Sequence, residues 1–422
     1  MKPLFLLGLL VAAPALGQGT GDVLPDPAAV EQAIASHPVV GAAEARLSAA
    51  RARARALASG GHEFTASATI GQREVNRVAD FTEYDISLTR PVRLPGKAGL
   101  DRKAGDAGVR AADNRADDAR HQAATSLSEH WWDWLGAAAE RRVLDTSAET
   151  LGEAVVAVSR RRQLRDAASM ELEQAEAALA TARAAARAAA GREAAARAAL
   201  TAQFPGLPLP ATAPVMPAPA LPPEGLAALG ALVAKRSHEI GAAMAEAEMA
   251  ALLAERARRE RIPDPSVGVR GFSEFGGAEQ GVGLLVSVPI GGRHRRALAD
   301  QAAAEAQASR AQATMIRHDI ESLAGRDVAA ADAGFAAWEE ALLARTRSRA
   351  AADRAARGHA LGGLDLADRL YAERLAQEAA LAETLARTEA WRAITRLRID
   401  SHTLWMHADG DAAQSAAAGE RP

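Results

Sequence analysis

The chain contains no cysteine and few aromatic residues, which make up 4% of its 422 residues. Without cysteine it has no disulfides, no thiolate metal sites, no cysteine nucleophile and no lipid-modified N-terminal cysteine. Its net charge of −3 lacks the basic excess that nucleic-acid-binding proteins carry, so no nucleic-acid partner is expected. No apolar run reaches the roughly 18 residues that a transmembrane helix needs.

Alanine dominates what the chain does contain. It supplies about half of the hydrophobic residues, which total 49% of the sequence. Ordinary cores are built from Leu, Ile, Val, Phe and Met, so an alanine-based apolar fraction cannot fill one. Alanine is also the strongest helix former, and its small side chain lets helices approach closely. The composition therefore predicts long, closely packed helices.

The N-terminus has the pattern of a secretory signal peptide. Met1-Lys2 gives a positive start, residues 4–11 are apolar, and the small residues Ala15 and Gly17 suit a cleavage site. Residues 1–17 are therefore predicted to direct export. At the other end, residues 408–422 are small and polar, and we expect a disordered tail.

A cluster of prolines at residues 205–223 divides the chain into two similar halves. Proline fixes φ and removes a backbone donor, so we interpret this segment as a connector. Residues 18–204 and 224–407 are then two structural repeats. The sequence at 36–43 resembles that at 237–243 with one residue deleted. Matching positions of the two halves are about 200 residues apart throughout.

Within each repeat, one segment changes from helical to two-residue periodicity. In the first, Tyr84, Ile86 and Leu88 share one face of a strand, while polar residues lie between them. Such alternation predicts half-exposed strands. We expect one β-hairpin per repeat, at about 64–92 and 265–290, with polar or Gly-rich loops at 72–80 and 273–280.

Strands of about 9–11 residues are long enough to cross a bilayer when tilted. Four strands cannot close a barrel, however, and an open sheet edge cannot lie in lipid. If the hairpins are in a membrane, several chains must therefore contribute to one barrel. The alternative is a soluble mixed domain; the export signal and the lack of another core for the strands to cover argue against it.

Both β-hairpins lead into long helical hairpins, predicted at about 97–203 and 292–404. Each has a polar or Gly-containing turn, which forms its tip. Asp365 and Asp368 lie three apart, on one helix face beside the second tip. Two interpretations stay open: compensation of the helix dipole, or a carboxylate ring where several chains converge. The candidate tip residues are Leu164, Arg165, Asp166 and Ala167 in the first turn, and Gly358, His359, Leu361 and Gly362 in the second.

No catalytic constellation is evident. The histidines are dispersed, no pair lies four apart, and no glycine-rich phosphate loop follows a strand. We therefore expect no catalytic residues, no cofactor and no metal site, and we do not expect an enzyme.

The ordered set of features resembles the TolC family of outer-membrane efflux proteins. That resemblance implies a mainly α fold with a β-barrel portion, in which a homotrimer builds one composite twelve-stranded barrel in outer-membrane lipid. It also implies a periplasmic α-helical tunnel, which at 1.5 Å per residue would be about 100 Å long. The matching segments are the opening at 26–38, the duplicated element order, the strand exits at 91–97 and 289–296, and the return-helix starts at 170–175 and 364–368.

The resemblance also implies a function: the exit duct of a tripartite efflux system in a Gram-negative bacterium. The tips would dock onto a periplasmic adaptor protein, and an inner-membrane pump would supply the energy. Asp365 and Asp368 match the family's aperture aspartates, with one extra residue after Gly358. The alternative is a periplasmic adaptor or helical scaffold protein, although adaptors usually have one helical hairpin flanked by compact β domains.

Two segments resemble one branch of that family more than the others. They are the Pro-Gly-Lys strand exit at 95–97 and the Pro-Asp-Pro segment at 263–265. Both are similar to the heavy-metal efflux branch of the cobalt–zinc–cadmium type. The chain departs from many drug-efflux members in lacking an N-terminal cysteine for lipidation and in its short connector.

Overall fold

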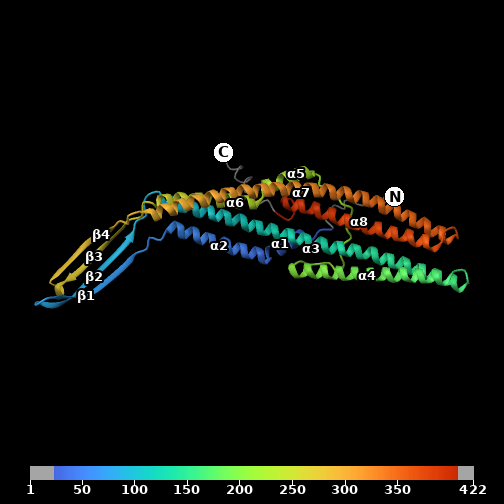
Figure 1. The fold of residues 1–422 in the computed structure, drawn as a ribbon, viewed down its shortest axis with the longest axis horizontal. Helices are drawn as coiled ribbons and strands as arrows, with labels where there is room; N and C mark the ends of the chain where they lie inside the picture. Colours follow the sequence, from blue (N-terminus) through green and yellow to red (C-terminus); the bar gives the residue numbers. More distant parts are fainter. Residues whose placement is uncertain (1–22, 407–422) are drawn as a thin grey trace, which may run out of the picture. The chain divides into compact units, whose positions relative to one another are not determined.

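The computed structural model describes residues 23–406, so the predicted signal peptide (1–17) and tail (408–422) lie outside the described residues. The chain is mainly helical and carries one four-stranded antiparallel sheet (Figure 1). The elements are α1 (Pro27–Ala35), α2 (Pro38–Ser59), β1 (Thr65–Val75), β2 (Ala79–Pro91), α3 (Lys97–Gln163), α4 (Ser169–Gln203), α5 (Leu226–Arg236), α6 (His238–Arg259), β3 (Ser266–Glu274), the 3-10 turn η2 (Phe275–Gly277), β4 (Glu279–Ser287), α7 (Arg293–Ala360) and α8 (Leu366–Asp400).

The same order of elements occurs twice. Helices α2 and α6 each have 22 residues, and the return helices α4 and α8 each have 35. The long helices α3 and α7 have 67 and 68 residues. The predicted fold class, a duplicated helix, β-hairpin, long helix and return helix, is confirmed. None of the helices within residues 23–406 is both long and apolar enough to cross a membrane.

The chain divides into two compact units, and each draws on both repeats. Of the described residues, the first unit contains 23–33, His130–Ala220 and Trp338–Thr388. The second contains Ile34–Glu129, Leu221–Ala337 and 389–406. The long helices therefore contribute to both units, and the sheet belongs to the second.

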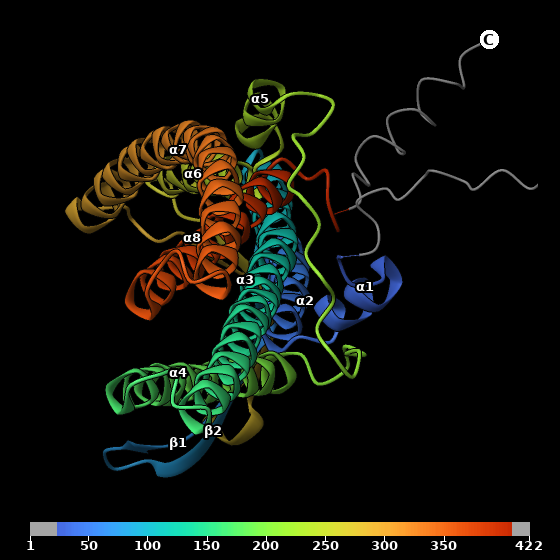
Figure 2. The ribbon, with the colours of Figure 1, turned by 90° about the vertical axis from the view of Figure 1, so that its right-hand side faces the viewer.

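Small side chains carry the helix packing in the first unit. Helix α4 lies beside the C-terminal part of α3 in both views (Figures 1 and 2). There Leu144 of α3 packs against the buried Ala186 and Ala189 of α4. Two turns further along α3, Leu151 packs against Leu179 and Ala182 of α4. Alanine on one side of each contact lets the helix axes come close, as the composition predicts.

The proline-rich connector of the first unit is held by arginine side chains. Arg142 donates to the carbonyls of Ala213 and Pro214 at 3.3 and 3.2 Å. Arg197 and Arg387 donate to other connector carbonyls at distances between 2.7 and 3.1 Å. Proline has no N–H to donate, so side-chain donors satisfy carbonyls that a regular element would pair internally.

The second unit has a conventional hydrophobic core of larger side chains. Leu229 and Val233 of α5 pack with Ile320 and Ala324 of α7 and with Leu397 of α8. These residues are at most 9% exposed. Here the helices are joined by Leu, Ile and Val rather than by alanine alone, which fixes α5 and α6 against the long helices.

The junction between sheet and helices in the second unit is built on the buried Lys97, which is 1% exposed. Its Nζ donates to Asp264 Oδ1 at 2.8 Å, to Glu260 Oε2 at 3.0 Å and to the Ile262 carbonyl at 2.8 Å. Asp264 Oδ1 also accepts from the Leu94 N–H at 2.9 Å. Lys97 begins α3 and Asp264 precedes β3, so this contact joins the strand exit of one repeat to the strand entry of the other.

These contacts shift the acidity of Asp264. Burial alone would raise its pKa, but hydrogen bonds from Lys97, Leu94 and His62, with the charge of Lys97, lower the pKa from 3.8 to about 2. The folded state therefore holds Asp264 ionised in a pH range where the unfolded chain has taken up a proton. Its contribution to stability is complete above about pH 4 and is lost as the pH falls toward about 2.

We predict that Asp264→Asn destabilises the protein by about 2 kcal/mol at pH 7 and by much less near pH 2.5, because the wild type loses this contribution in acid. Denaturant unfolding of the purified full chain at both pH values measures the difference. Asp106→Asn, an exposed position on the same helix as Lys97, is the matched control and should show no such pH-dependent difference. If Asp264→Asn lowers the free energy of unfolding equally at both pH values, the ionised Asp264 carboxylate is not the source of this stability.

Candidate functional site

The four strands form one antiparallel sheet in the order β1-β2-β3-β4. Each β-hairpin belongs to one repeat, and β2 and β3 join them. In the register, Leu88 of β2 lies opposite Val269 of β3, and Val269 lies opposite Leu284 of β4. Because side chains alternate between faces, residues that lie opposite one another share a face. One face of the sheet is therefore apolar over most of its length: Ala66, Ala68, Ile70, Tyr84, Ile86, Leu88, Val267, Val269, Val282, Leu284 and Val286. Polar residues of the same face, Gln72, Thr82, Arg90, Ser273 and Gln280, lie toward the ends of the strands.

This apolar face is not covered by the chain itself. Leu284 is 88% exposed, Val282 87% and Ile70 73%. Scattered exposed apolar residues are normal on soluble proteins, but a contiguous sheet face of them marks a partner or a membrane. The strands have 11, 13, 9 and 9 residues, which matches the length a tilted strand needs to cross a bilayer.

The opposite face is mainly polar. It carries the hydroxyls of Thr65, Ser67, Thr69 and Thr89, and a charge pair in which Arg270 donates to Asp85. Phe272 and Leu285 also lie on this face. A sheet that is apolar on one side and polar on the other fits a wall between lipid and water.

Strands β1 and β4 leave the outer edges of the sheet unpaired within the described chain. Such edges present rows of N–H and C=O groups, each of which is costly to place in hydrocarbon. Both edges therefore need further strands if the apolar face meets lipid.

The predicted loops of the β-hairpins were too long. Residues 72–75 and 79–80, expected in the first loop, are strand, and the ion pair of Arg73 with Glu83 at 2.7 Å supports the extension. In the second hairpin the strands run to Glu274 and restart at Glu279, with the turn η2 between them. Cross-strand pairing of polar side chains therefore carries the strands beyond the apolar region.

The second candidate region is the pair of helical-hairpin turns in the first unit. Both long helices end in the same hydrogen-bond pattern: Asp166 N–H donates to the Arg161 carbonyl at 2.8 Å, and Gly363 N–H to the Gly358 carbonyl at 2.9 Å. The residue before each donor has positive φ, 61° at Arg165 and 77° at Gly362. This left-handed C-cap ends a helix sharply and reverses the chain.

The predicted tip residues of the two turns are brought together by Arg161. Its guanidinium pairs with the Asp166 carboxylate at 3.0 Å and lies 3.2 Å from Nε2 of His359. The His359 ring also contacts the Leu364 carbonyl through Nδ1 at 3.1 Å. Below the turns, Val158, Leu172, Ala175 and Leu366 form a buried cluster from α3, α4 and α8. Sequence reasoning named His359 and Asp166 but missed Arg161, whose pairing depends on the fold.

The two aspartates lie at the start of α8 and are exposed. Asp365 Oδ1 accepts the backbone N–H of Asp368 at 2.7 Å, so Asp365 caps the helix. Leu164, Arg165, Asp166, Leu361 and Gly362 are exposed beside them, while Ala167, Gly358 and His359 are half-buried. An aperture made by these aspartates would require several chains, and it stays a prediction.

Solved structures of outer-membrane channels share the fold of this chain. No family model matches the chain, and no curated protein matches it. Among solved structures, the outer-membrane channel OprN is similar with a TM-score of 0.72 at 20% identity, covering 90% of this chain and 91% of that one. The outer-membrane protein VceC of Vibrio cholerae is similar with a TM-score of 0.73 at 17% identity, covering 90% and 96%.

A third solved structure, CusC, is described by its conformational changes accompanying folding and transmembrane channel formation. It is similar with a TM-score of 0.74 at 16% identity, covering 92% of this chain and 95% of that one. At these identities the likeness concerns the fold, over nearly the full length of each chain. The chain thus has the fold of outer-membrane channels.

Proposed function

We propose that this chain is the exit duct of a tripartite efflux system. It would act as a homotrimer in the outer membrane of a Gram-negative bacterium and conduct substrates passively. The observation that carries the proposal is the sheet: an exposed apolar face, a polar opposite face and two unpaired edges. Three copies of four strands would supply twelve strands, pair every edge and close a barrel with its apolar face toward lipid.

The helices support a tunnel continuous with such a barrel. Helices of 67 and 68 residues extend about 100 Å at 1.5 Å per residue. Their contacts in the first unit rely on alanine, which lets many helices stand side by side around a bore without filling it. A passive tunnel needs no nucleotide site, and the energy would come from an inner-membrane pump.

The tips are the proposed docking points for a periplasmic adaptor. The turns at 164–167 and 358–362 expose Leu164 (79%) and Leu361 (88%), two apolar side chains on tight, capped turns. Exposed apolar residues on rigid turns suit insertion between the helices of a partner. The adaptor alternative for this chain itself has less support, because the described chain has two helical hairpins and a single sheet.

We further propose that the chain belongs to the heavy-metal branch of these channels, on the two segments that resemble that branch. The two segments that resemble it, Pro95-Gly96-Lys97 and Pro263-Asp264-Pro265, meet through the buried Lys97 and Asp264. The two segments therefore form one structural unit at the sheet junction.

Membrane insertion predicts different outcomes for two neighbouring leucines. Leu284 is on the apolar face and Leu285 on the polar face. Leu284→Arg should lose most of its outer-membrane trimer, because arginine on the lipid face costs about 2–4 kcal/mol near the bilayer midplane. Leu285→Arg should assemble like the wild type. Heat-modifiable trimer in the isolated outer-membrane fraction is the measurement, and equal yields for both variants would contradict lipid contact of this face.

The aperture assignment predicts an effect of removing charge at the second tip. Asparagine is the suitable replacement, because Asp365→Asn keeps the helix cap that Asp365 provides. The double variant Asp365→Asn, Asp368→Asn should weaken block of single channels by a trivalent cation at least about tenfold, since six carboxylates of a trimer would lose their charge. Planar-bilayer recordings measure the block.

Asp353→Asn is the control for that experiment. Asp353 lies on α7 before the tip and pairs with Arg349. It should leave the block unchanged. If the double variant is blocked as strongly as the wild type, Asp365 and Asp368 do not line the aperture.

A further inference from the structure

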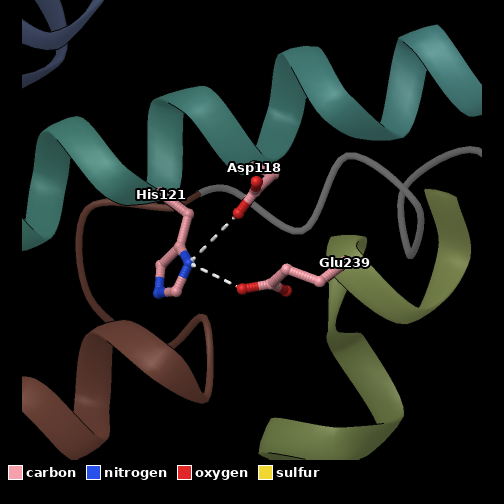
Figure 3. A group of neighbouring side chains, drawn as sticks. All are labelled: Asp118, His121 and Glu239. Carbon is pink, nitrogen blue, oxygen red and sulfur yellow. Dashed lines mark ion pairs between the residues drawn. The ribbon is translucent and has the colours of Figure 1, made fainter. Parts of the chain in front are cut away.

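Three side chains from two helices of the second unit converge on one point. Asp118 and His121 lie one turn apart on α3, and Glu239 lies in the first turn of α6 (Figure 3). Nδ1 of His121 is 4.0 Å from Asp118 Oδ1 and 3.8 Å from Glu239 Oε1. The facing nitrogen and two oxygens all lie within 4.8 Å of one another.

The orientation of the imidazole is set from its other side. Nε2 of His121 lies 2.7 Å from Asp400 Oδ1. The second oxygen of Asp400 accepts from Arg396 Nε at 2.6 Å, which keeps this group a carboxylate. Nε2 therefore carries the hydrogen, and the lone pair of the neutral ring is on Nδ1. A carboxylate behind a histidine in this way is the usual support of a metal-binding imidazole.

The inward-facing side of the cluster includes one buried oxygen without a hydrogen-bond donor. His121 is 7% exposed, and its Nδ1 is too far from both carboxylates for a hydrogen bond. Asp118 Oδ1 is buried, and no nitrogen or hydroxyl donor among the described residues reaches it. The outward oxygens are already used, because Asp118 Oδ2 accepts from Gln122 at 2.8 Å and Glu239 Oε2 from Ser237 at 2.7 Å.

We propose that Asp118, His121 and Glu239 bind a divalent transition-metal ion such as Zn²⁺. Two carboxylates and a neutral imidazole bring a charge of −2, which balances the ion. One nitrogen and two oxygens suit Zn²⁺ and its neighbours better than Ca²⁺ or Mg²⁺, which take oxygen ligands alone. Ligand atoms on a tetrahedral Zn²⁺ are about 3.3 Å apart. Side-chain rotations that move each of the three ligand atoms by less than about 1 Å would therefore bring them to this spacing.

Nearby groups shape the site without adding to the ligand set. His402 stacks on His238 with ring centroids 4.7 Å apart and lies 5.5 Å from the His121 ring. Asp117, the neighbour of Asp118, pairs with Arg120 at 2.7 Å, and its other oxygen lies 4.0 Å from Nδ1 of His238. The ion would join α3 to α6, two helices from different repeats, and so act as a clip within the second unit.

Sequence reasoning missed this site for a definite reason. A search for paired histidines on one helix finds none, and Glu239 is far along the chain from His121. The one local sign is the spacing of Asp118 and His121, three residues apart on one helix face. The equivalent turn of the first repeat has Pro38 where the second has Glu239, so the first repeat lacks this carboxylate.

The test is metal titration of the EDTA-treated, detergent-solubilised full chain with ZnCl₂ in competition with a chromogenic chelator. The expected result is one tight site per chain. Asp118→Asn and Glu239→Gln keep the side-chain shapes and should each lower the affinity at least about tenfold. Asp117→Asn, one residue away on the same helix, is the matched control and should bind like the wild type.

A second measurement does not depend on affinity. Zn²⁺ should raise the thermal midpoint of the wild type by a few degrees, since it binds only the folded arrangement, and should not do so for Glu239→Gln. Asp400→Asn should weaken binding about 10-fold or more while leaving the stoichiometry at one, as expected for a positioning residue. The proposal is overturned if no saturable site appears, or if Asp118→Asn and Glu239→Gln both bind Zn²⁺ like the wild type. In that case the cluster is an ion-pair network around a protonated His121.

Discussion

The rest of the structure depends on the unmet hydrogen bonds at the two edges of the four-stranded sheet. The sheet has an apolar face that the chain leaves exposed, and its outer strands β1 and β4 have no partner in the described chain. Lipid tolerates the first feature but not the second, because unpaired backbone groups in hydrocarbon each cost several kcal/mol. In the proposed channel, closure with strands from other copies satisfies both. The oligomer would then be part of how this chain folds in a membrane, and the polar face would line the pore.

The junction between the sheet and the long helices is the second constraint, because the chain changes direction there. Lys97 stabilises this junction. In the proposed channel, a strand would end in lipid head groups and a helix would begin in water, so the chain must change direction within a few residues. Lys97 ties that change to Asp264, at the strand entry of the other repeat, and to Glu260 at the end of α6. The two repeats are thus locked at the point where all four strands meet the helices. Within the first unit, alanine contacts allow the helices to line up closely.

Much of this architecture could be read from periodicity and composition, and the parts that could not share one cause. Two-residue alternation assigns Ile86 and Leu284 to a strand face whatever the partner, so the faces were predictable. The pairing of β2 with β3, the contact of Lys97 with Asp264, and the meeting of Arg161 with His359 depend on helix rotation and long-range register. The residues next to each other in the sequence do not determine these long-range contacts. The β-hairpin loops were predicted too long because polar cross-strand pairs such as Arg73 and Glu83 look like loop residues in sequence.

The most direct test of the account uses the absence of cysteine, which leaves no background thiols. One cysteine is placed in β1, at Ser67 or Thr69, and one in β4, at Gly283, Leu285 or Ser287, so that the panel covers alternative registers between copies. After oxidation in the membrane, at least one double variant should migrate as a covalent trimer on a non-reducing denaturing gel, while the single-cysteine variants do not. Monomers throughout the panel would contradict closure of the sheet by neighbouring copies, and with it the channel.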